Sequence, residues 1–89
     1  MQNEDGQEIK SRFFLALQTL KNNREIRGVS TFTLKYKINR RNMWKLKQDY
    51  NRKLDVAWLA YLVSDYNVSA HWLLTGQGDM FTKNTKELK

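Results

Sequence analysis

The sequence predicts an all-α fold of five short helices, and three observations support this class. The 89 residues include no proline and only four glycines, so few positions interrupt a helix. Apolar residues recur at spacings of three and four, as they do on the buried face of a helix. Asn39, Asp55 and Ser69 each precede such a segment, and these residue types cap helix N-termini.

The first helix is expected over residues 8–23. Its apolar face comprises Ile9, Phe13, Ala16, Leu17 and Leu20. Gly28 interrupts the pattern, and Ser30 or Thr31 is then the expected N-cap of a second helix over residues 30–36. Phe32 and Tyr36, four residues apart, should face inward from this helix.

The third helix is expected over residues 40–48, after the N-cap Asn39. A helical wheel places Met43, Leu46 and Tyr50 on one face. The opposite face carries Arg41, Lys45 and Gln48, with Arg40, Asn42 and Trp44 at its flanks. This helix is therefore expected to pack on a core and present hydrogen-bond donors to a partner.

A loop over residues 49–54 should lead to a fourth helix, 56–66, capped by Asp55. Its predicted buried stripe comprises Val56, Leu59, Leu62, Val63 and Tyr66. Ser69 should cap a fifth helix, 70–75, which Gly76 ends. We expect one domain over residues 8–81, a flexible N-terminus over 1–7 and a flexible tail over 82–89.

The positive charge is concentrated in one segment. The chain has a net charge of +7, and residues 35–53 alone hold eight Lys and Arg against the single acidic Asp49. A localised cationic stripe is typical of proteins that bind a phosphate backbone. The simpler alternative is a solvated surface that only aids solubility.

Composition excludes several other kinds of function. The chain has no cysteine and only one histidine, His71, which rules out thiolate zinc sites and histidine clusters. No nucleophile–base pair or phosphate-binding glycine loop can be assembled, so neither an enzyme nor a cofactor is expected. No apolar run approaches the roughly 18 residues of a membrane span, and we expect a cytoplasmic protein.

Two short helices joined by a short turn, the second of them basic, fit the geometry of a helix-turn-helix. Arg, Asn and Gln have the donor geometry to read guanine and adenine edges in the major groove. The aromatic residues form no stacking platform of the kind that single-stranded RNA needs. Duplex DNA is therefore the expected partner.

The chain also resembles the lambda-repressor-like helix-turn-helix domains of the XRE type, especially the phage CI-repressor and Cro-like group. The resemblance rests on the Val-Ser-Ala-His-Trp-Leu-Leu-Thr-Gly stretch at 68–76 and the Gln-Gly-Asp-Met-Phe that follows. Segments 55–68 and 38–43 resemble the fourth helix and the entry to the recognition helix. The chain departs from the family at Thr33, where an alanine is common, and at Lys37, where a glycine is common. It also reads Lys-Gln-Asp at 47–49, where Glu-Asn-Gly is common.

The resemblance implies roles by position. Base contacts are expected from Arg40, Arg41, Asn42 and Lys45, of which Arg40, Asn42 and Lys45 are open to a phosphate role instead. Backbone contacts are expected from Ser30, Thr31, Asn39, Trp44, Gln48, Arg52 and Lys53, where free N–H groups of Ser30 and Thr31 would take part. For Trp44, packing against the domain edge is the favoured alternative.

The family further implies a sequence-specific transcriptional repressor, bacterial or phage-encoded, that binds a palindromic operator as a homodimer. Leu74, Met80 and Phe81 are candidates for the dimer face, although we expect Met80 and Phe81 to fold back over the domain. The alternative function is a protein-interaction module or antitoxin with the same fold, because a fold alone does not decide function.

Overall fold

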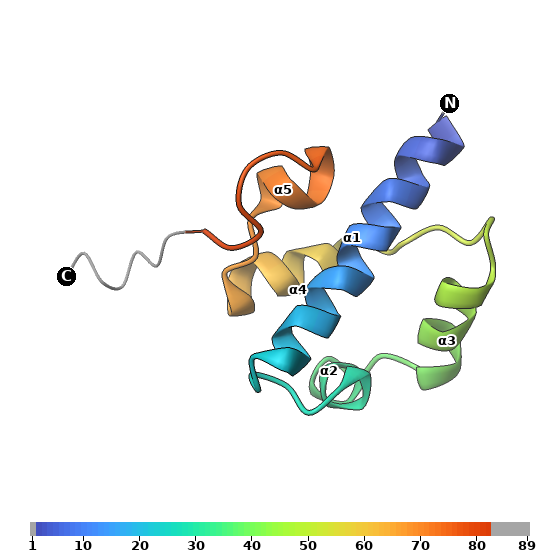
Figure 1. Ribbon diagram of the computed structural model, residues 1–89. Coiled ribbons are helices and arrows are strands. Elements are labelled where there is room, and N and C mark those ends of the chain that lie inside the picture. The colour runs from blue at the N-terminus through green and yellow to red at the C-terminus, as the bar shows by residue number, and fades with distance from the viewer. Residues whose placement is uncertain (1, 83–89) are drawn as a thin grey trace. The chain divides into compact units, whose positions relative to one another are not determined.

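The computed structural model describes residues 2–82, and side chains from Gly6 onward. These residues form five α-helices and one isolated β-bridge, which confirms the all-α class. The chain divides into two compact units, Met1–Leu54 with α1 to α3 and Asp55–Lys89 with α4 and α5 (Figure 1). A single domain over residues 8–81 stays a prediction. Apart from Thr82, the tail predicted to be flexible lies outside the described residues.

Helix α1, Gln2–Asn22, begins six residues earlier than predicted. Residues 2–7 were expected to precede the helix because they are polar, yet they are helical, and their flexibility stays a prediction. A tertiary contact accounts for part of the early start, since the Gln7 side chain donates a hydrogen bond to the Tyr50 carbonyl. The helix ends at Asn22, well before Gly28. Just after its end, Arg24 takes a left-handed conformation with φ 67°, and Glu25 N–H donates to the Leu20 carbonyl over 2.9 Å.

The core of the N-terminal unit follows the predicted apolar face of α1. Phe13, Ala16, Leu17 and Leu20 are buried, and Ile9 is half-buried. Phe32 from the second helix is fully buried, with its ring centroid 6.0 Å from that of Phe13 in an edge-on arrangement. Aromatic packing of this kind fixes α2 on α1.

Helix α2, Val29–Lys35, begins one residue earlier than predicted and has Gly28 as its N-cap, without a side-chain cap. The predicted caps, Ser30 and Thr31, are wrong because both lie inside the helix. The Thr31 hydroxyl instead accepts a hydrogen bond from the Arg27 N–H over 3.2 Å, which holds the preceding turn. Thr33 is buried, and its hydroxyl donates to the Ser30 carbonyl over 3.0 Å.

The turn that follows α2 closes with a Schellman motif. Ile38 N–H donates to the Thr33 carbonyl over 2.8 Å, and Lys37 N–H donates to the Leu34 carbonyl over 3.4 Å. The Lys37 backbone is in the left-handed region, with φ 56°. Glycine takes this conformation most easily, so a lysine here is under conformational strain.

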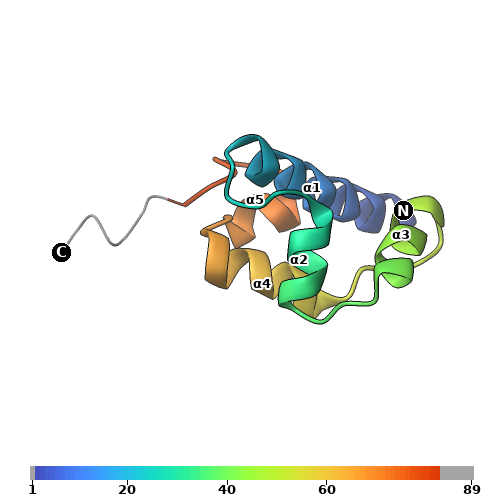
Figure 2. The same ribbon diagram turned by 90° about the horizontal axis from the view of Figure 1, so that it is seen from below.

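Four residues separate α2 from α3, Arg40–Gln48, and the two helices run in clearly different directions. Figure 1 looks along α2 with α3 seen from the side, and Figure 2 shows α2 from the side. The chain therefore changes direction within this short turn.

In the C-terminal unit, α4, Val56–Tyr66, and α5, Ala70–Thr75, have the predicted bounds. Asp55 and Ser69 cap them through hydrogen bonds from Ala57 N–H over 2.9 Å and Trp72 N–H over 3.1 Å. Leu62 is fully buried, but Val56 is 73% exposed and does not belong to the buried stripe. Leu59, Val63 and Tyr66 are half-buried.

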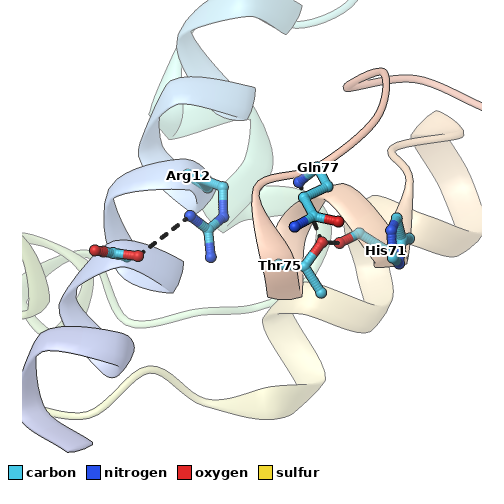
Figure 3. A network of polar contacts seen from close by, with 5 residues as sticks. Arg12, His71, Thr75 and Gln77 are labelled. Atoms are coloured by element: carbon cyan, nitrogen blue, oxygen red, sulfur yellow. Dashed lines mark hydrogen bonds and ion pairs between the residues drawn. The ribbon is translucent and has the colours of Figure 1, made fainter. Parts of the chain in front are cut away.

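The end of the described chain folds back on this unit, as expected for Met80 and Phe81. Phe81 forms an antiparallel bridge with Val68, and Ser69 N–H donates to the Met80 carbonyl over 2.7 Å. Gly76, in the left-handed conformation with φ 79°, ends α5 before this return. Thr75 supports the same corner, since its hydroxyl donates to the His71 carbonyl over 2.6 Å and accepts from Gln77 N–H over 3.1 Å (Figure 3).

Replacing Lys37 with glycine should raise the free energy of unfolding by up to about 1 kcal/mol, because glycine relieves the left-handed strain at the turn. Lys37→Ala is the matched control, since it also removes the side chain and its charge but keeps the strain. Chemical denaturation of both variants measures the difference. Equal stabilities for Gly and Ala at this position would contradict the conformational explanation.

Candidate nucleic-acid interface

Helix α3 has the predicted bounds and the predicted cap. The Asn39 side-chain oxygen accepts from Arg41 N–H over 2.8 Å and from Asn42 N–H over 3.1 Å. Met43 and Leu46 are buried, and the other seven residues of the helix are exposed. Tyr50, predicted to share their face, is 58% exposed. The helix ends at Gln48, so a helical wheel does not describe the direction of the Tyr50 side chain.

The four predicted base readers, Arg40, Arg41, Asn42 and Lys45, are all exposed on α3. Trp44 is 62% exposed. Both of its predicted roles, packing against the domain edge and contact with the DNA backbone, stay predictions. Trp44 lines a surface hollow together with Phe14, Val29 and Met43.

The residues predicted to contact the DNA backbone differ in their exposure and in whether their hydrogen-bonding groups are free. Arg52 and Lys53 are exposed in the loop after α3, and Gln48 is exposed at its last position. Ser30 is exposed in the first turn of α2 and Thr31 is half-buried. The Thr31 backbone N–H donates to the Gly28 carbonyl over 3.0 Å, so it is not the free donor that was expected. The Asn39 side-chain oxygen is likewise occupied by its capping bonds.

A buried lysine on α1 fixes the far end of α3. Lys10 is only 6% exposed, and its Nζ lies 3.0 Å from the Leu46 carbonyl oxygen, 3.0 Å from that of Asp49 and 2.8 Å from that of Arg52. Only a protonated amine offers three N–H donors, one for each carbonyl. The ammonium also lies at the C-terminal end of α3, where the helix dipole favours a cation.

The surroundings of Lys10 act on its charge in opposite directions. Desolvation by burial lowers the pKa of Lys10 below its ordinary value of 10.5, the nearby negative charge of Asp49 opposes this, and the positive charge of Arg52 adds to the lowering. Asp49 is the one acidic residue in the cationic segment 35–53. It therefore helps to keep this buried cation charged.

The spacing of the sequence does indicate that Lys10 is buried, although the prediction of the apolar face of α1 did not include it. Lys10 precedes Phe13 by three residues and Leu17 by seven, so it shares their side of α1. A lysine on the buried face of a helix needs hydrogen-bond partners inside the fold. Which carbonyls it binds depends on tertiary structure.

Four exposed cations of α3 form no ion pair with the residues that the structure describes. In the part of the chain that the structure describes, Arg40, Arg41, Lys45 and Lys47 form no ion pair, whereas Arg12 on α1 lies 3.9 Å from Glu8 (Figure 3). Residues 55–82 of the C-terminal unit contain three aspartates and neither lysine nor arginine. The cationic excess thus lies on α3 and its flanks, available to an anionic partner.

Comparison with models of protein families, with curated proteins and with solved structures found no match for this chain. Every helix among residues 2–82 is too short or too polar to cross a lipid bilayer. The same residues bring together no group of three His, Cys, Asp or Glu side chains that could hold a metal ion.

Replacing Lys10 with methionine should lower the free energy of unfolding by about 1–3 kcal/mol, because it leaves carbonyls around α3 without their donor. Hydrogen exchange should accelerate most in residues 46–52, the segment that these carbonyls belong to. Lys21→Met, an exposed change on the same helix, serves as the control. Unchanged protection of residues 46–52 in Lys10→Met would contradict the anchoring role.

Proposed function

We propose that this protein binds duplex DNA sequence-specifically, with α3 in the major groove. The observation that carries the proposal is the division of α3 into faces: two buried residues hold it on the core, and the opposite face presents Arg41, Lys45 and Gln48. Cationic and amide donors on one exposed helix face suit both phosphates and base edges.

The roles divide by position along the helix. Arg41 is the principal base reader, because it lies opposite Met43 and Leu46 near the start of α3, with Arg40, Asn42 and Lys45 beside it. Arg52 and Lys53 bind phosphates from the following loop, and Ser30 and Trp44 contact the backbone from either side of the turn. Phosphate contacts set the register, and base contacts set the sequence.

We further propose that the chain is a lambda-repressor-like helix-turn-helix regulator of bacterial or phage origin, acting in the cytoplasm as a homodimeric repressor. The left-handed Lys37 in the turn and the capping of α3, α4 and α5 at the positions inferred from the sequence support this assignment. In such a dimer, half-sites lie about 34 Å apart, one turn of DNA.

A protein-interaction module or antitoxin is the second candidate, and the C-terminal unit provides the observation that favours it. Val56 is 73% exposed and Leu74 is 54% exposed, at an apolar groove of about 250 Å³ between α4 and α5. Exposed apolar surface of this kind is typical of protein contacts. The two candidates differ in whether the isolated chain binds duplex DNA.

The affinity for duplex DNA should fall steeply with salt. If about five phosphates are neutralised, log K should fall against log salt concentration with a slope of about −4 to −5. Fluorescence anisotropy with labelled random and selected duplexes measures this slope. Failure to bind duplex DNA even at low salt would contradict the proposed function and favour the interaction module.

Two substitutions separate base reading from phosphate binding. Arg41→Ala should cost about 1–3 kcal/mol on the selected site and relax its preference at one base position, whereas Lys53→Ala should weaken binding to all sequences alike. Affinities for selected and scrambled duplexes are compared for each variant. Equal losses on both duplexes from Arg41→Ala would remove Arg41 from base reading.

A further inference from the structure

The N-terminal unit has a surface hollow of about 270 Å³ bounded by all three of its helices. Helix α1 contributes Phe14, α2 contributes Val29, and α3 contributes Met43 and Trp44. These four side chains make most of the wall apolar. Pockets for small molecules are mostly apolar with a few polar groups, and this volume lies just below their usual range, which limits the occupant to one or two rings.

Two aromatic residues indicate the shape of that occupant. Phe14 is half-buried and held edge-on against Phe13, with ring centroids 5.1 Å apart. Trp44 is 62% exposed, a large indole surface left in contact with water. A flat aromatic ring in the hollow would pack against both and cover part of that surface.

Two cations indicate its charge. Arg40 and Lys47 both line the hollow, and no Asp or Glu does. The two residues lie seven apart on α3, on the same side of the helix. Lys47 Nζ lies 5.9 Å from the centroid of the Phe14 ring, so this charge is already directed toward the aromatic wall. The planar fork of arginine matches a carboxylate.

We propose that this hollow is a binding site for a small planar aromatic carboxylate. Its ring lies between Phe14 and Trp44, and its carboxylate pairs with Arg40 and Lys47. This site does not depend on the proposed function. Its consequence does: because Arg40 and Trp44 also belong to the proposed DNA-binding surface, a bound acid antagonises DNA binding.

Naphthalene-2-carboxylate is the probe, and naphthalene-2-carboxamide is its neutral match in shape. Isothermal titration of the full chain should show the acid binding at least about tenfold more tightly than the amide, as expected when a charged pair is lost. The indole N–H signal of Trp44, assigned with Trp44→Phe, should shift more than those of Trp58 and Trp72. Equal affinity for the acid and the amide would overturn the proposal without needing any variant.

Two variants then place the acid in the hollow. Arg40→Gln should weaken the acid about tenfold and leave the amide unchanged, whereas Lys21→Gln, an exposed change on α1 outside the lining, should alter neither. An unchanged acid affinity in Arg40→Gln overturns the site as described. Competition with labelled duplex then tests the antagonism separately, since a chain that binds the acid but no DNA keeps this site and loses the proposed function.

Discussion

The candidate interface depends on the hydrogen bonds that the Lys10 ammonium donates at the C-terminal end of α3. The ammonium joins α1 to the carbonyls of Leu46, Asp49 and Arg52, so one charge fixes both the end of the helix and the loop after it. The outward directions of α3 and of Arg52 are therefore set together. At the other end of the helix, Asn39 caps two backbone N–H groups. These two caps matter because a nine-residue helix has little stability alone.

A buried cation beneath a cationic surface is destabilised by desolvation and by repulsion from like charges, and Asp49 reduces this cost. Burial and Arg52 both lower the pKa of Lys10, and Asp49 opposes them. Asp49 also acts through its backbone and side chain, since its carbonyl accepts from Lys10 and its carboxylate accepts from Asn51 N–H over 2.9 Å. A single acidic residue thus orders the loop and supports the charge that anchors it.

The elements that could be predicted from the sequence are those whose ends carry their own signals. Asn39, Asp55, Ser69 and Gly76 mark helix ends through local hydrogen bonds or backbone conformation, and the bounds of α3, α4 and α5 followed from them. The start of α1 and the cap of α2 have no such local marker. The contact of Gln7 with Tyr50 accounts for part of the former, and Gly28 caps α2 without a side-chain hydrogen bond. Within the site, the exposed residues of α3 followed from its period. The partners of Lys10 did not, because these three carbonyls lie 36 to 42 residues away along the chain.

The errors in the predicted buried faces also have a physical pattern. Tyr50 lies beyond the last residue of α3, and Val56 is the first residue of α4. A helical wheel assumes neighbours along the whole face, but at a helix end the packing surface stops and the side chain enters solvent. In α3 the same shortness leaves only Met43 and Leu46 inside. The exposed face with Arg41, Lys45 and Gln48 and the side formed by Arg40, Trp44 and Lys47 are therefore both available for binding. Because Met43, Leu46 and the caps at both ends hold α3 in place, most of its outer positions can contact a partner.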